Sequence, residues 1–424
     1  MTSSQEAASD RSLRGLAVIA VAIVAAILPA FFLGSLSVEI RAELRYGETA
    51  AGLVFAAFFA ASALVSSRVG RRVDRVGPRI ALSYALAGTC VIEFFIALGA
   101  NQLVWLVLLS GLAGICNATA QLGANVFIAR NLPVHRQGIG FAVKQSAMPG
   151  AALIAGLLLP SIALTIGWRW VFVTGSVLSV LALVAVRWRL APERTQEGSE
   201  GDSRSSSDAR KKSVTGAHLM KSDASSDTST ASALPVFALF MLAVAAAFAT
   251  AAAITLGGFF VESTINSGVT AATAGYAFAL GSVISILVRL TVGFYADRHM
   301  GNLLGVVAIM ILLGSCTSLI FVFQTPAAHF IGLPLAFGAG WAWPGLFNLS
   351  VVRASPGFPG RATGITQTGV YVGGAVGPVL FGLTAEHWSY AAAWVLAAVL
   401  GVCAAAAVLV GRRFLHRPLS LQAR

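Results

Sequence analysis

The length, composition and charge of this chain exclude a soluble fold. Of its 424 residues, 57% are hydrophobic and 11% are charged, and the net charge is +12. Soluble domains carry about a quarter charged residues, so this composition cannot cover a water-exposed surface. Twelve spans of about 20 residues would use roughly half of the chain, which indicates a protein that crosses a bilayer many times.

Apolar runs long enough to cross a bilayer fall into two groups of six. Because the backbone must satisfy its own hydrogen bonds in lipid, each run is predicted to be a helix, which gives an all-α membrane protein with twelve transmembrane helices. The stretch between the groups is rich in serine and charge, which is typical of disorder. The predicted parts are a cytoplasmic N-terminal tail at 1–14, a six-helix bundle at 15–190, a disordered cytoplasmic linker at 191–232, a second six-helix bundle at 233–411 and a cytoplasmic C-terminal tail at 412–424.

The distribution of basic residues predicts the orientation of the chain. With the N-terminus in the cytoplasm, 24 of the 29 Lys and Arg residues fall in cytoplasmic segments, whereas only Arg41, Arg45 and Arg169 fall outside. The positive-inside rule therefore predicts a multi-pass protein of the plasma or inner membrane with both termini in the cytoplasm. Orientation and contact with anionic lipid explain the positive charge, so no nucleic-acid partner is predicted.

The two groups of spans repeat one another. Gly70, Asp74 and Arg75 after the second span recur as Gly293, Asp297 and Arg298 after the eighth, at a constant offset. In the same way Asn125 and Arg130 recur as Asn348 and Arg353, and Gln145 recurs as Gln367. Two six-helix repeats in the same orientation predict a binding site between the halves, near the middle of the membrane.

These residues resemble the cytoplasmic signature of the major facilitator superfamily of secondary transporters. The first copy comprises Gly70, Asp74, Arg75, Gly77 and Arg79, with Pro78 where a basic residue is usual. The resemblance implies two pseudo-symmetric six-helix halves that rock around a central cavity. It also implies a cytoplasmic gate, in which Arg130 and Arg353 would be basic partners for the aspartates. The alternatives are a loop that only fixes topology and arginines that only anchor helix ends.

In a protein of this family the cavity would be lined by spans one, four, seven and ten, with spans two, five, eight and eleven beside them. Arg289, in span eight, is similar in its spacing to an arginine of carboxylate-transporting branches, and Lys144 lies in span five; either cation has interfacial snorkelling as its alternative role. Asn117 and Gln121 of span four lie on one face of a helix, which either faces the cavity or contacts another helix. The tryptophans of span ten, Trp341 and Trp343, either line the cavity or simply pack against their surroundings. The predicted substrate-binding residues are Lys144, Gln145, Arg289, Asn117, Gln121, Trp341, Trp343 and Gln367.

Acidic residues are scarce inside the spans. Glu93 in span three is a candidate for proton coupling, and the alternatives are a partner for a basic residue and a protonated structural carboxyl group. Glu39 and Glu262 lie at the outer ends and are expected to be solvated. Two intramembrane cations against one carboxyl group favour an anionic substrate.

The leading functional hypothesis is proton-coupled uptake of a small organic anion by a monomeric secondary transporter. The alternatives are efflux of amphipathic compounds or drugs, and a non-transporting membrane sensor or scaffold that uses the 191–232 linker. The sequence has no phosphate-binding glycine loop and its six histidines are scattered, so we predict no enzyme activity, no cofactor and no metal.

Overall fold

The structure is a computed structural model of the 424-residue chain. It describes the backbone of residues 3–132, 137–190, 236–298, 301–355 and 359–415, and it leaves undescribed the side chains of residues 3–14, 67, 74, 129, 137, 138, 297 and 359–361. The predicted linker at 191–232 and the C-terminal tail from residue 416 onward therefore lie outside the described residues.

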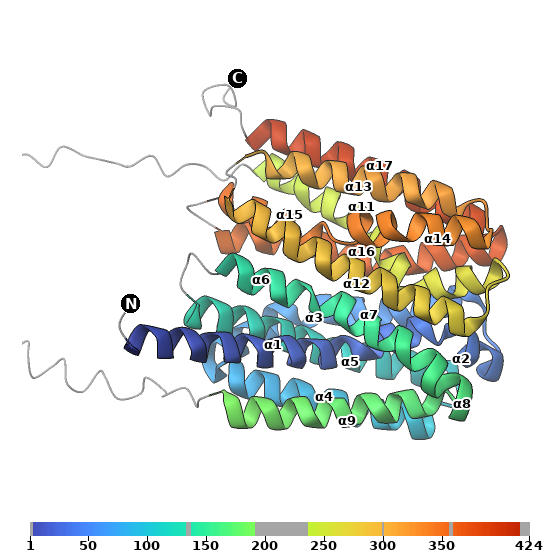
Figure 1. Ribbon diagram of the computed structural model, residues 1–424, viewed down its shortest axis with the longest axis horizontal. Helices are drawn as coiled ribbons and strands as arrows, with labels where there is room; N and C mark the ends of the chain where they lie inside the picture. The colour runs from blue at the N-terminus through green and yellow to red at the C-terminus, as the bar shows by residue number, and fades with distance from the viewer. Residues whose placement is uncertain (1–2, 133–136, 191–235, 299–300, 356–358, 416–424) are drawn as a thin grey trace, which may run out of the picture. The chain divides into compact units, whose positions relative to one another are not determined.

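Twelve helices in the described part of the chain are long and apolar enough to cross a membrane, and they run side by side as one bundle (Figure 1). This confirms the predicted fold class. The N-terminal half holds α1 (Ser3–Ser35), α2 (Ser37–Leu44), α3 (Glu48–Val76), α4 (Pro78–Gly99), α5 (Leu103–Asn131), α6 (Gln137–Gln145), α7 (Ala147–Leu158), η2 (Leu159–Ala163), α8 (Leu164–Ile166) and α9 (Trp168–Arg189). The C-terminal half holds α11 (Val236–Asn266), α12 (Ala271–Arg298), α13 (Leu303–Phe321), α14 (Pro326–Leu335), η3 (Ala336–Gly340), α15 (Pro344–Arg353), α16 (Pro359–His387) and α17 (Tyr390–Leu415). We call the end of the bundle where α1 begins the base, and the end near α2 the far end.

The fifth and tenth spans are interrupted next to Pro149 and Pro344, the prolines at which the sequence indicates a bend and a kink. In the fifth span α6 ends at Gln145 and α7 begins at Ala147, two residues before Pro149. In the tenth span α14 passes into the π-helical turn η3, and α15 begins only at Pro344. A proline removes one backbone N–H group and thereby interrupts the helical hydrogen-bond ladder. Each interruption leaves main-chain carbonyl groups that need another donor.

The two halves meet along two seams, and α1 also packs against α11. At one seam α12 packs against α6 and α7, and at the other α16 packs against α3. Backbones approach closely where glycines face each other: a Cβ atom on Gly156 would lie 2.6 Å from the carbonyl oxygen of Gly275, and one on Gly275 would lie 2.7 Å from that of Gly156. Small residues allow such contacts between membrane helices, where lipid supplies no hydrophobic driving force for association. The halves therefore lie in direct backbone contact.

Candidate functional site

Arg289 of α12 is buried at the α6–α12 seam, with an exposed fraction of 4%. Its Nη1 donates to the carbonyl oxygen of Gln145 at 2.6 Å, across the seam, and its Nη2 donates to the carbonyl oxygen of Trp341. The Gln145 carbonyl lies four residues before Pro149, which has no N–H group to bond it. Trp341 lies in the interruption between η3 and α15. One guanidinium group thus binds carbonyls from both interrupted spans.

The hydrogen-bonding capacity of Arg289 is only partly used. Its Nε is buried and has no hydrogen-bond partner among the described atoms. Its two observed partners are neutral carbonyl groups, and no carboxylate of the described residues forms a salt bridge with it. A buried guanidinium held by neutral dipoles keeps most of its charge uncompensated.

Lys144 lies beside this arrangement, one residue before Gln145. Its half-buried Nζ donates to Oδ1 of Asn125 on α5 at 2.7 Å, which joins two of the residues that the sequence singled out. Asn117 is buried and its Oδ1 has no hydrogen-bond partner in the described part of the chain, while Gln121 is partly buried. Of these amide side chains on α5, Asn125 therefore binds a cation of the α6–α12 seam, Lys144.

The two tryptophans of the tenth span occupy different surroundings. Trp341, 2% exposed, faces the other half, and its ring centroid lies 5.7 Å from that of Phe31 on α1. Trp343, 1% exposed, packs on Phe347 and lines a cavity of about 20 Å³ among helices of the C-terminal half. The sequence predicts that both tryptophans line a site between the two halves, but only Trp341 lies at the interface between the halves.

Gln367 belongs to the α3–α16 seam. The hydroxyl group of Tyr371, one turn further along α16, interacts with the side chains of Gln367 and Ser66. Ser66 Oγ itself donates to the Ser62 carbonyl of its own helix α3 at 2.5 Å. This seam joins the halves through neutral side chains and does not bring Gln367 to the Arg289 site.

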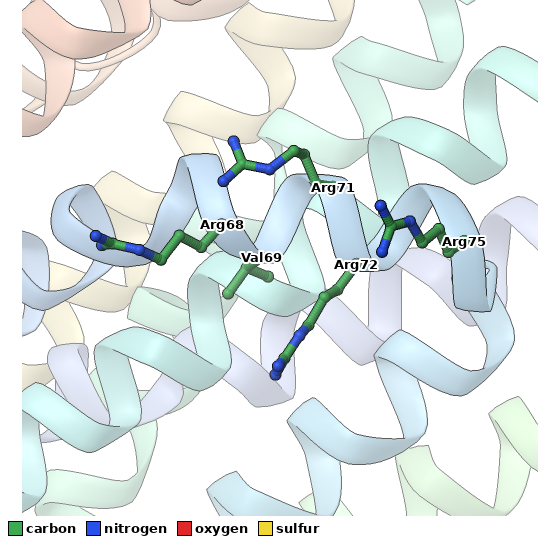
Figure 2. A pocket seen from close by; sticks show the side chains of 5 residues that line it. All are labelled: Arg68, Val69, Arg71, Arg72 and Arg75. Carbon is green, nitrogen blue, oxygen red and sulfur yellow. The ribbon is translucent and has the colours of Figure 1, made fainter.

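The signature residues lie at the base of the bundle. Gly77 has φ of 80°, a left-handed conformation that favours glycine, and Pro78 then starts α4. Arg68, Arg71, Arg72 and Arg75 are exposed and fan out from the end of α3 around an open hollow of about 360 Å³ (Figure 2). The backbones of Asp74 and Asp297 are helical, but their side chains lie outside the described residues.

Two basic residues of the predicted gate, Arg79 and Arg353, donate to helix ends of their own halves. Arg79 donates to the carbonyl oxygen of Arg187 at the end of α9, at 2.7 Å, and Arg353 donates to that of Ala296 near the end of α12, at 2.9 Å. Both contacts satisfy carbonyls of a last helical turn. Arg130 and Arg298 are exposed at the ends of α5 and α12, and Gly293 of the second signature lies against Ala142 of α6. The gate itself stays a prediction.

Glu93 is fully buried between α4 and α9. Its Oε2 accepts a hydrogen bond from Ser179 at 3.0 Å, and its Oε1 is buried without a hydrogen-bond partner among the described atoms. A Cβ atom on Gly175 would lie 2.4 Å from that oxygen, so the carboxyl group rests on bare backbone. Since α4 packs mainly on helices of its own half, Glu93 lies away from both seams.

The expectation that Glu39 and Glu262 are solvated is wrong. Glu262 is 5% exposed, because α2 folds over the end of α11. The Glu262 carboxylate forms an ion pair with Arg41 and accepts a hydrogen bond from Ser37 at 2.9 Å. Arg41 also pairs with Glu48 at 2.8 Å. Glu39 is partly buried in α2, and burial raises the pKa of its carboxyl group.

A second contact across the halves lies at the same end of the bundle. A carboxylate oxygen of Glu386, on α16, accepts the backbone N–H of Thr49 at 2.7 Å and so caps the start of α3. The residues that meet at the far end are therefore Ser37, Arg41, Glu48, Thr49, Glu262 and Glu386. No sequence signal marks these residues as partners, because the fold of α2 and the ends of α11 and α16 bring them together.

Comparisons with known proteins agree with this architecture. The family model of the Major Facilitator Superfamily matches residues 15–374 and 242–422. The multidrug resistance protein MdtG of Dickeya zeae (strain Ech586) is 32% identical over 148 residues, a match that covers 34% of this chain and about a third (36%) of that relative. The crystal structure of a bacterial homolog of the human lysosomal transporter Spinster, in an inward-facing and occupied conformation, superposes with a TM-score of 0.69 at 16% identity, over 94% of this chain and 96% of that one.

Proposed function

The chain belongs to the Major Facilitator Superfamily and is a membrane transporter, not an enzyme, and from this premise we propose that it moves small organic anions by alternating access. Arg289 is the observation that carries the proposal. It is a buried cation at a seam between two halves that must separate and rejoin in every transport cycle. The site is thereby sealed in one state and accessible in another.

The chemistry of the Arg289 site favours an anion. A guanidinium removed from water costs several kcal/mol, and main-chain carbonyls offset this less well than a carboxylate does. A carboxylate can accept two parallel hydrogen bonds from one guanidinium, and such charge-assisted bonds are about twice as strong as neutral ones. Lys144, next to Gln145 on the same helix, adds a second positive charge close by. An anion entering this seam would therefore replace neutral partners with a stronger one.

The experiment is transport of radiolabelled carboxylates into proteoliposomes by Arg289→Gln, Arg289→Lys and wild-type protein. Arg289→Gln is expected to abolish transport while the protein is still extracted and monodisperse. Arg289→Lys is expected to retain a small fraction of wild-type transport, because lysine keeps the positive charge but lacks the planar guanidinium that donates two parallel hydrogen bonds. Arg189→Gln, an exposed arginine at the end of α9, is the matched control. Full activity of Arg289→Gln would overturn the anion model.

For coupling, we infer uptake driven by a proton gradient, with Glu93 as the proton carrier. Supporting this, Glu93 is a buried carboxyl group that contacts a serine and, in the described part of the chain, no cation. Glu93→Gln is expected to abolish accumulation driven by a pH gradient and to leave anion exchange intact. Ser179→Ala serves as the control for packing at this contact. Gradient-driven accumulation by Glu93→Gln would show that the proton travels elsewhere.

Efflux of amphipathic compounds is the second candidate function. The relative named as a multidrug resistance protein and the aromatic residues around Trp341 favour it. In that case, expression in a sensitive host would raise resistance to lipophilic compounds. Resistance to lipophilic cations in particular would contradict the anion model, since Arg289 would repel them. For either function we propose the cell membrane as the location, with both termini in the cytoplasm, and a monomer as the working unit.

A further inference from the structure

The Arg289 guanidinium lies at the edge of an aromatic cluster. We define this cluster as Phe31, Phe278, Phe337 and Trp341, all 2% exposed or less. The Trp341 ring centroid is 5.5 Å from that of Phe337 and 6.5 Å from that of Phe278. The guanidinium carbon of Arg289 lies 6.0 Å from the Trp341 ring centroid, within the range of cation–π attraction. One flat apolar surface and one cation thus adjoin at a single place.

The aromatic cluster crosses from one half to the other. Phe31 comes from α1, whereas the other three rings come from the C-terminal half, and Phe31 meets Trp341 edge to face with an interplanar angle of 68°. At Gly257 of α11 a Cβ atom would lie 2.8 Å from the Phe31 ring and 3.6 Å from the Trp341 ring. Both rings therefore pack against bare backbone, and separation of the halves removes Phe31 from Trp341 while Phe278 and Phe337 stay beside it.

We propose that the transported anions are aromatic carboxylates, an inference that rests on the proposed anion function and specifies its substrate class. The aromatic ring of the substrate takes the place of Phe31 against Trp341 when the halves separate. Its carboxylate takes the N–H groups of Arg289 that now bind the carbonyls of Gln145 and Trp341. Phe31 and the Gln145 carbonyl, the two partners that lie across the seam, are then replaced by one molecule.

The surroundings of Trp341 discriminate against other anions. The only polar atom in the rings of the aromatic cluster is the indole nitrogen of Trp341, so a sugar acid or a hydroxy acid would bury most of its hydroxyl groups there without hydrogen-bond partners. An aliphatic carboxylate of equal size fills the space but offers no ring for edge-to-face or stacked contact with Trp341. The expected order of affinity is therefore aromatic, then aliphatic, then hydroxylated carboxylates.

The test is binding of phenylacetate, hexanoate and gluconate to the purified full-length protein, measured as ligand-dependent thermal stabilisation and as competition for transport in proteoliposomes. Wild-type protein is expected to bind phenylacetate about two- to tenfold more tightly than hexanoate, which is what one aromatic contact contributes, and gluconate weakest of all. Trp341→Ala is expected to remove the difference between phenylacetate and hexanoate, whereas Trp341→Phe is expected to retain it. Trp170→Phe, an exposed tryptophan on α9, is the control and should leave the ratio unchanged.

The outcomes separate this inference from the function on which it rests. Equal binding of phenylacetate and hexanoate, with both lost in Arg289→Gln, would overturn the aromatic specificity and leave the anion function standing. Tightest binding of gluconate would likewise overturn it. Should none of the three anions stabilise the protein or enter proteoliposomes, the anion function fails and the aromatic specificity fails with it. Because the ratio of two ligands is read on each variant, a partial loss of folded protein does not obscure the result.

Discussion

The two seams between the halves occupy equivalent positions of the internal repeat and differ in chemistry. Ser66 on α3 is the repeat counterpart of Arg289 on α12, and Gln367 on α16 is the counterpart of Gln145 on α6. The α6–α12 seam holds the buried guanidinium and Lys144. The α3–α16 seam holds the hydroxyl groups of Ser66 and Tyr371 beside Gln367. A duplicated framework therefore carries a cationic contact on one side and a neutral contact on the other.

The backbone explains why only one seam accommodates a buried cation. Four residues after Gln145 stands Pro149, so the Gln145 carbonyl is left to Arg289, whereas four residues after Gln367 stands Tyr371, which has its own N–H group. The helix α16 runs on without interruption at this point. The position of a proline, and not the side chain opposite, decides where a neutral acceptor is free to bind a guanidinium.

The largest effect is expected when a cation is placed in the neutral seam. Ser66→Arg would put a guanidinium opposite a helix whose carbonyls are already bonded, and we expect a loss of about 2 kcal/mol or more of stability. Ser66→Ala should cost less than about 1 kcal/mol. The measurement is the apparent melting temperature of detergent-extracted protein. A Ser66→Arg protein as stable as wild type would refute the role of the free carbonyl.

A smaller effect is expected where Lys144 meets Asn125. Asn125→Leu leaves the ammonium group without its acceptor and should destabilise the protein by about 1–3 kcal/mol. Adding Lys144→Met should restore most of that loss, since both partners are then apolar. The repeat counterpart Asn348 has Thr366 at the position of Lys144, so Asn348→Leu should cost less. Equal costs at the two asparagines would show that Lys144 is not the reason for the difference.

A change at Pro149 tests the free carbonyl directly. Pro149→Ala gives the Gln145 carbonyl a helical N–H partner, which then competes with Arg289. In this background Arg289→Gln should cost about 1 kcal/mol less stability than in wild type, the size of a typical coupling between residues that share one contact. Pro29→Ala in α1, a proline inside another spanning helix, is the control and should show additive costs. If the costs of Pro149→Ala and Arg289→Gln are additive as well, the interruption at Pro149 does not determine how Arg289 is bound.

The smallest effect is expected at Tyr371. Tyr371→Phe removes one hydroxyl group from the neutral seam and should lower stability by about 0.5–1.5 kcal/mol, with transport unchanged. Thermal melting and proteoliposome transport measure the two quantities on one preparation. A loss of transport in this variant would show that the α3–α16 seam takes part in substrate binding, which would remove the distinction between the seams.

The sequence predicts the spans and the repeat well, because apolar runs and constant offsets depend only on local composition. It also singles out Arg289 and Lys144, since a charge inside an apolar run is conspicuous. It does not predict the partners of Arg289, which are main-chain atoms that become free through interruptions in two other spans. It misplaces Trp343 and Glu262 for a related reason: the turn before α15 and the fold of α2 set their surroundings, and neither depends on hydrophobic periodicity.

The contact between Gly156 and Gly275 has a kinetic consequence for a molecule whose halves must move past each other. Interlocked side chains slide only if they change rotamer, and each such change adds to the activation barrier of the movement. Two bare backbones in contact require no rotamer change, so this contact adds little to the activation barrier. An alanine at either position would place a methyl group less than 3 Å from the opposite carbonyl oxygen and would be expected to slow the interconversion of states more than it alters their relative populations.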